Sequence, residues 1–96
     1  MPNDFPFHIS IPPDIQFSDL ALRRHNGAIR LNWEPLEKLC QASLMDLRFF
    51  KEGPEYLVAA LITAWYMEHR QRGGAPDAVM EIFLEEIANE EAAPLN

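Results

Sequence analysis

The chain has 96 residues, of which 48% are hydrophobic and 10% aromatic, so it can bury a core and is not a disordered acidic tail. Its formal charge is −7, and the whole excess lies in residues 52–96, where nine acidic residues accompany only two arginines. A field of this sign repels nucleic acid and membrane phosphate and favours basic partners.

We expect a single domain over residues 1–96, with flexible ends at 1–4 and 91–96. The single cysteine, Cys40, rules out an internal disulfide framework and is typical of a reducing compartment. The first residues lack the basic and apolar stretches of a signal peptide, and the longest apolar run, 56–67, is about half the ~20 residues of a membrane span. We therefore predict a cytoplasmic protein with no membrane partner.

Residues 5–11 alternate between apolar and other side chains, with Phe5, Phe7, Ile9 and Ile11 on one side. This period of two predicts a strand with one buried face. Because Pro6 has no N–H to donate to a ladder, the strand should lie at the edge of a sheet.

The pair Asn26-Gly27 predicts a β-hairpin, because both central residues of a type I′ turn need positive φ. A two-residue loop there pairs His25 with Ala28, Arg24 with Ile29, Arg23 with Arg30 and Leu22 with Leu31. Four apolar side chains then share one face: Leu20, Leu22, Leu31 and Trp33. On the other face Arg23 lies opposite Arg30, a pair of like charges that costs stability unless a carboxylate binds them.

The hydrophobic period becomes helical from residue 33 onward. Asn32 is a good N-cap for a first helix, and residues 44–51 should form a short second one. Residues 54–72 predict a long helix that Gly73-Gly74 ends, and residues 76–90 predict the last helix.

The apolar stripes of these helices predict the core. The positions are Leu36, Leu39, Cys40, Ser43, Leu57, Val58, Leu61, Ile62, Trp65, His69, Val79, Met80, Phe83, Leu84 and Ile87. The fold class that follows is α+β: a short antiparallel β-sheet (the N-terminal strand plus the β-hairpin) followed by three to four α-helices.

Several positions outside the predicted core are candidates for binding a partner. The long helix has small or weakly polar residues opposite its apolar face, and the last helix has one exposed apolar residue among its glutamates. With the two opposed arginines, the candidate partner-binding residues are Arg23, Arg30, Ala59, Ala60, Thr63, Met67 and Ile82. Two interpretations of the arginines stay open: a carboxylate of the last helix binds them within the chain, or a partner does so.

No pattern predicts a catalytic, cofactor-binding or metal site. The histidines and Cys40 never occur at a metal-ligand spacing, and Cys40 lies on an apolar stripe, where a thiol is buried and inert. The paired carboxylates Glu85-Glu86 and Glu90-Glu91 belong to an exposed face. We predict that the protein is not an enzyme and needs no cofactor. A cleft that gathers His69 with buried carboxylates would reopen that question.

Residues 39–50 offer an alternative, because small Cys40 and hydrophobic Phe50 have the spacing of a helix-turn-helix. Such motifs usually have glycine in the turn, where this chain has Leu44. One alternative is therefore a nucleic-acid-linked transcriptional regulator with a degenerate helix-turn-helix at 36–51. Another is an acidic DNA mimic that inhibits a DNA-binding protein. At this net charge we expect no binding of duplex nucleic acid by the protein itself.

The segment AWYMEHRQRGGAPDAVMEIFLEE (Ala64 to Glu86) resembles small uncharacterised proteins encoded by bacterial phages and prophages, and the likeness extends back through NWEPLEKLC. It transfers no catalytic residue and implies an accessory or assembly role. The function that we predict is a non-enzymatic protein-interaction module, acting by binding a protein partner or a second copy of itself in a homodimer. No small-molecule ligand is expected.

Overall fold

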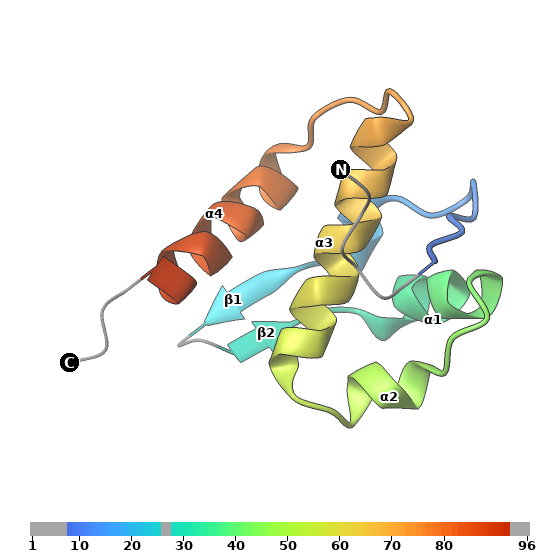
Figure 1. Cartoon of the computed structure of the whole chain (residues 1–96), viewed down its shortest axis with the longest axis horizontal. Coiled ribbons are helices and arrows are strands. Elements are labelled where there is room, and N and C mark those ends of the chain that lie inside the picture. Colours follow the sequence, from blue (N-terminus) through green and yellow to red (C-terminus); the bar gives the residue numbers. More distant parts are fainter. Residues whose placement is uncertain (1–7, 26–27, 93–96) are drawn as a thin grey trace.

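A computed structural model describes residues 8–25 and 28–92, and this part of the chain has an α+β fold with a two-stranded antiparallel sheet and four α-helices. The long helix α3 crosses in front of the hairpin, with α1 and α2 on one side and α4 on the other (Figure 1). The elements in chain order are the 3₁₀-helix η1 (Phe17–Leu20), strands β1 (Arg23–His25) and β2 (Ala28–Arg30), and helices α1 (Trp33–Ala42), α2 (Leu47–Lys51), α3 (Glu55–Gln71) and α4 (Ala78–Ala92).

The predicted N-terminal strand is wrong for the residues that can be checked. Residues 5–7 lie outside the described part of the chain, and residues 8–11 pair with no strand. Ser10 instead binds the end of α1: its N–H donates to Ser43 Oγ at 2.8 Å, and the Ser43 hydroxyl donates to the Ser10 carbonyl oxygen at 3.3 Å. Ile9 is nevertheless buried. Alternation of apolar and polar side chains indicates an extended segment with one buried face. Such a segment can pack on helices without pairing with a strand.

The predicted hairpin register is confirmed, since β1 and β2 pair Arg23 with Arg30, Arg24 with Ile29 and His25 with Ala28. The Asn26-Gly27 turn itself lies outside the described residues. The ladder ends one step before the predicted pair of Leu22 and Leu31, which are both half-buried against the core. Strand β1 does not extend back past Leu22, because η1 ends at Leu20 and Ala21 has a left-handed φ of 48°.

The start of α1 and both ends of α3 lie within one residue of the prediction, whereas α2 and α4 begin later than predicted, α4 at Ala78 and not at residue 76. Asn32 Oδ1 accepts the N–H of Glu34 at the start of α1. After α1 the chain passes through Leu44, whose φ of 58° is left-handed, and Asp46 then caps α2 by accepting the N–H of Arg48 at 3.0 Å. Helix α2 therefore begins at residue 47 and not at 44.

Gly73 ends α3, as the sequence predicts. Its φ of 84° is left-handed, its N–H donates to the carbonyl of Arg70 at 3.0 Å, and the N–H of Gly74 donates to the carbonyl of His69 at 2.9 Å. These two bonds form a Schellman motif, which satisfies carbonyls that would otherwise lack partners at the helix end. The chain can then reverse direction and begin α4 beside α3.

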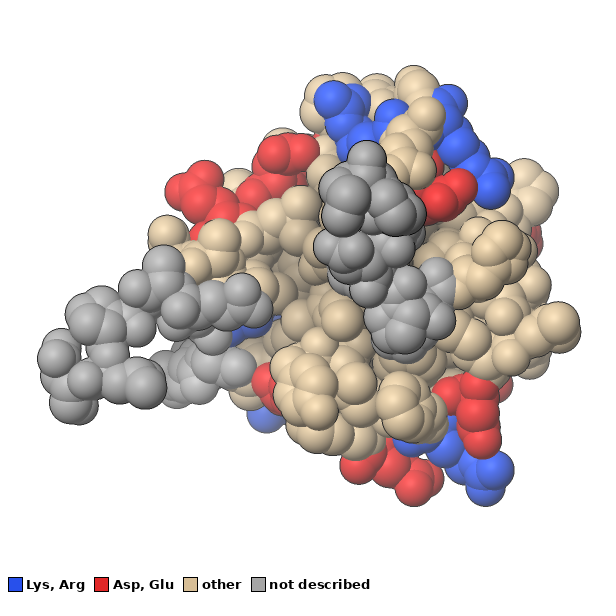
Figure 2. Space-filling model, viewed as in Figure 1, with Lys and Arg blue, Asp and Glu red and all other residues tan. Residues whose placement is uncertain are grey.

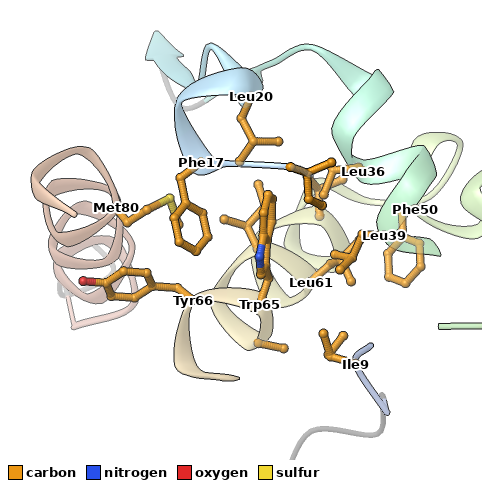
Figure 3. Close-up of a cluster of buried hydrophobic side chains, with 14 of the residues drawn as sticks. Ile9, Phe17, Leu20, Leu36, Leu39, Phe50, Leu61, Trp65, Tyr66 and Met80 are labelled. Atoms are coloured by element: carbon orange, nitrogen blue, oxygen red, sulfur yellow. The ribbon is translucent and has the colours of Figure 1, made fainter. Parts of the chain in front are cut away.

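The core surrounds α3 and is closed by η1 on one side and by α1 on another (Figure 3). Trp65 is 2% exposed, and its ring centroid lies 4.4 Å from that of Phe17. From α4 the core receives Met80 and Phe83, both buried as predicted. Val79 was expected in the core but is 54% exposed, because it lies at the edge of the helix face that carries Met80 and Phe83 into the core.

Candidate partner-binding groove

An open groove of about 350 Å³ lies between the hairpin and α4. On one wall is the edge of β1, and on the other is one flank of α4. We call this space the β1–α4 groove; its lining residues are Leu22, Arg23, Arg24, Val79, Ile82, Phe83 and Glu86. Two residues that the sequence predicted separately, Arg23 and Ile82, are therefore brought to the same place.

The α4 wall of the groove is apolar and exposed. Val79 and Ile82 are 54% and 58% exposed, whereas Phe83 beneath them is 2% exposed. Positions 79, 82 and 86 are spaced by three and four residues, which places them on one flank of a helix. The wall therefore offers two aliphatic side chains over a buried aromatic floor, with the Glu86 carboxylate one turn farther along.

The hairpin wall of the groove is cationic. Arg23 and Arg30 are exposed and lie opposite each other in the ladder, and neither forms an ion pair with any of the described residues. Arg24 points inward: its side chain is 10% exposed, its Nε lies 3.9 Å from Glu86 Oε1, and its guanidinium lies 6.0 Å from the Phe83 ring centre. Helix α4 thus supplies a carboxylate to the hairpin, but this carboxylate pairs with Arg24 and not with Arg23 or Arg30.

The remaining candidate residues lie elsewhere, on α3. Ala59, Ala60 and Thr63 are half-buried, Met67 is 42% exposed, and the Thr63 hydroxyl donates to the Ala59 carbonyl oxygen at 2.7 Å. None of them lines the groove. On the face seen in Figure 2, the Lys, Arg, Asp and Glu atoms that are visible gather toward the rim.

Sequence reasoning missed Val79 and Tyr56. Tyr56 begins the exposed side of α3 and is 70% exposed. A helical wheel places it with Ala60 and Met67, so the sequence contained that signal. Val79 gave no such signal, because the side on which α4 meets the hairpin depends on the tertiary arrangement.

A second cleft, of about 330 Å³, holds His69 near Asp77 and Ser18. Its polar groups already have roles in the fold. His69 Nε2 is 2.8 Å from the Ala75 carbonyl oxygen, and Asp77 Oδ1 accepts the N–H of Met80 as the N-cap of α4. No hydrogen bond joins Ser18 to His69 within residues 8–25 and 28–92. The cleft therefore brings a histidine to a carboxylate without pairing a nucleophile with a base.

Tyr66 joins α3 to the start of α4. Its hydroxyl donates to the Glu81 carboxylate and accepts the N–H of Asp77 at 3.1 Å. The bond to Glu81, followed by burial, raises the pKa of the Tyr66 hydroxyl above its usual range. Glu81 is thus used within the chain and not for binding a partner.

Cys40 has the properties of an inert thiol. It is 1% exposed, and burial, helped by the charge of Asp46, raises its pKa to about 11. Among the described residues, no group of histidine, cysteine and acidic side chains could hold a metal ion. In the same part of the chain, no helix is long and apolar enough to cross a membrane.

Comparisons with protein-family models, with curated proteins and with solved structures found no match to this chain. The phage resemblance of residues 64–86 stays a hypothesis. Function is therefore argued from the geometry of the groove.

Proposed function

We propose that the protein is a non-enzymatic interaction module that binds a protein partner through the β1–α4 groove. The observation that carries this proposal is the exposure of Val79 and Ile82 beside Arg23 in one groove. Adjacent exposed apolar side chains mark interaction surfaces, and arginine is enriched at protein–protein interfaces.

The energetics of the groove favour a protein over a small molecule. Fully burying an aliphatic side chain is worth about 1.5–3 kcal/mol, so Val79 and Ile82 together offer a substantial apolar contact. Both stand at the open edge of the groove and not at the bottom of a pocket, which suits a broad surface. Arg23 adds a charge-assisted hydrogen bond for a partner's carboxylate.

The test is capture of binding partners by tagged protein carrying Ile82→Asp or Val79→Asp. A carboxylate in the centre of the interface should abolish capture of any specific partner, because the charge would have to be desolvated. Leu44→Asp is the matched control: Leu44 is 94% exposed and lies in the α1–α2 connection, away from the groove. Unchanged capture by both groove variants would reject the proposal.

A DNA-linked regulator is a second candidate, for one specific reason. Leu44 has the left-handed φ that the glycine of a helix-turn-helix usually provides, and it lies between α1 and α2. Against it, α2 has five residues, and at 1.5 Å per residue it is about 7.5 Å long, which is short for a recognition helix. The cation Arg48 also binds Asp46 at 3.2 Å.

Gel retardation of random duplex DNA at low salt separates the two candidates. The interaction module should cause no shift, because net negative charge opposes phosphate binding. A salt-dependent shift that Arg48→Ala removes would favour the regulator. A phage-related accessory role in the cytoplasm belongs to the proposal too, and it is supported by the resemblance of residues 64–86 alone.

A further inference from the structure

We infer that the occupant of the β1–α4 groove is an acidic segment of another protein, whose carboxylates bind Arg23 and Arg30 while its aliphatic side chains cover Val79 and Ile82. This inference rests on the proposed function and names the chemistry of the partner at that same surface. Two observations point to it. The opposed guanidinium groups form no ion pair with any described residue, and the aliphatic wall beside Arg23 is uncovered.

The two faces of the hairpin differ in what they contact. Arg24 and Ile29 face inward, where Arg24 is near Glu86 and Ile29 packs against the core. Because neighbouring side chains of a strand point to opposite faces, Arg23 and Arg30 lie on the outer face. They are directly opposite each other in the ladder, where side chains on one face are about 5 Å apart. Two like charges at this spacing are destabilising, so a carboxylate that binds both would stabilise the hairpin.

The carboxylates that meet the hairpin already have other contacts. Glu86 Oε1 lies 3.9 Å from Arg24 Nε on the inner face. Glu55, at the start of α3, accepts the backbone N–H of Ile29 with its Oε2 at 3.2 Å. In the described part of the chain, neither carboxylate forms an ion pair with the two outer arginines. The outer guanidinium groups therefore keep donors for a carboxylate from another chain, whose two oxygens can accept from both of them.

The α4 wall determines what else the occupant must carry. Val79 and Ile82 are both more than half exposed, and Arg23 lines the same groove. Covering them with aliphatic side chains removes apolar surface from water, whereas the phosphates of nucleic acid bind through cations and gain nothing from this wall. A protein segment that combines carboxylates with aliphatic side chains therefore fits both walls at once.

The net charge of −7 does not prevent this contact. At physiological ionic strength charges are screened over about 8 Å, so a bound carboxylate responds mainly to the groups beside it. Arg23 and Arg30 make the outer face of the hairpin cationic, whereas the exposed Glu85 and Glu86 belong to α4. The same contrast sets the orientation of the partner: its acidic side chains lie over the hairpin and its aliphatic ones over α4.

Selection from a library of random peptides displayed on yeast tests the inference. Peptides enriched on wild-type protein should carry Asp or Glu beside aliphatic residues. Arg23→Glu should weaken binding of the enriched peptide by about tenfold or more in isothermal titration calorimetry, because it removes one guanidinium and gives Arg30 a carboxylate within the chain. The new cross-strand pair of opposite charges should leave the thermal stability unchanged or higher, so unfolding would not explain the loss.

Two further variants serve as controls. Lys38→Glu makes the same change of charge on α1, where Lys38 is 3.6 Å from Asp14, and should leave peptide binding unchanged. The double variant Arg23→Glu/Arg30→Glu should enrich peptides with Lys or Arg in place of acidic residues, because it reverses the charge of the outer face.

The outcomes separate this inference from the proposed function. If wild-type protein enriches no acidic peptide, or if Arg23→Glu binds the enriched peptide as well as wild type does, the inference is overturned. Aliphatic peptides without acidic residues that Ile82→Asp no longer binds would reject the acidic partner and leave the proposed function standing. Acidic peptides that bind Ile82→Asp and Val79→Asp normally, but not Arg23→Glu, would place the contact on the hairpin alone and contradict both. Duplex DNA retarded by wild type and not by Arg23→Glu would assign the two arginines to phosphate and overturn the inference.

Discussion

Helices α3 and α4 have similar lengths but very different surroundings. In α3, six side chains are buried and line the centre of the domain. Among the side chains described in α4, only Met80 and Phe83 are buried, and Val79 and Ile82 face the groove. The difference indicates a division of labour: α3 holds the fold together, and α4 is anchored by a few side chains and can present an apolar flank to a partner.

The largest expected effect comes from removing the centre of α3. Trp65→Ala should destabilise the domain by about 3–5 kcal/mol, because it leaves a cavity beside Phe17 in a fully packed core. Total stabilities of about 5–15 kcal/mol mean that this change alone could unfold the protein. Urea unfolding followed by far-UV circular dichroism measures it. The matched control Tyr56→Ala, on the exposed side of α3, should shift stability by no more than about 0.5 kcal/mol. Equal losses in the two variants would contradict the role given to α3.

Neighbouring residues of α4 allow the anchor and the groove flank to be separated. Met80→Ala should cost about 2–5 kcal/mol, since Met80 is 0% exposed and packs into the core. Val79→Ala, one residue earlier and 54% exposed, should change stability by no more than about 0.5 kcal/mol. Thermal unfolding of both variants checks the pair. A loss with Val79→Ala as large as with Met80→Ala would show that the groove flank belongs to the core.

The start of α4 depends on its N-cap. Asp77→Ala should cost about 1 kcal/mol, because the side chain accepts the N–H of Met80 and satisfies a donor at the first turn. Hydrogen exchange should speed up in the first turn of α4 and not in α3. Asp14→Ala is the control, since its ion pair with Lys38 at 3.6 Å is exposed and contributes little. Uniform acceleration over both helices would contradict independent anchoring of α4.

The end of α3 provides the smallest test. Gly73→Ala should cost up to about 1 kcal/mol, since Gly73 has a left-handed φ of 84°. An added Cβ there would meet no atom within 4 Å, so the loss comes from the backbone alone. Ala21→Gly is the reverse case. Because Ala21 has a left-handed φ of 48°, glycine at this position should raise the stability of the protein or leave it unchanged. If both changes had the same sign, backbone strain would not be the cause.

The same contrast explains what could be predicted from the sequence. The hairpin register, the start of α1 and the end of α3 were predicted correctly, because each depends on local chemistry. The alternation around Arg24 determines the register, Asn32 caps the start of α1, and Gly73 ends α3. The strand at residues 5–11 was not confirmed where it can be checked, because alternation reports burial and not strand pairing.

The groove could not be predicted, because it depends on how two distant segments meet. Arg23 and Ile82 were chosen for different reasons, and only the fold brings them together. Val79 was assigned to the core because a helical period does not tell which flank the rest of the domain covers. Local rules thus predict the elements, whereas the uncovered side of α4 follows from tertiary packing.

The central claim is that the groove flank of α4 contacts another protein chain. The most direct measurement replaces Ile82 by a photoreactive phenylalanine analogue, irradiates the protein alone and in bacterial lysate, and identifies the crosslinked peptides by mass spectrometry. The same analogue at Leu44, which is 94% exposed and distant from the groove, is the control. The account predicts one dominant crosslinked chain from position 82 and none from position 44. Equal crosslinking at both positions, or none at position 82, would contradict it.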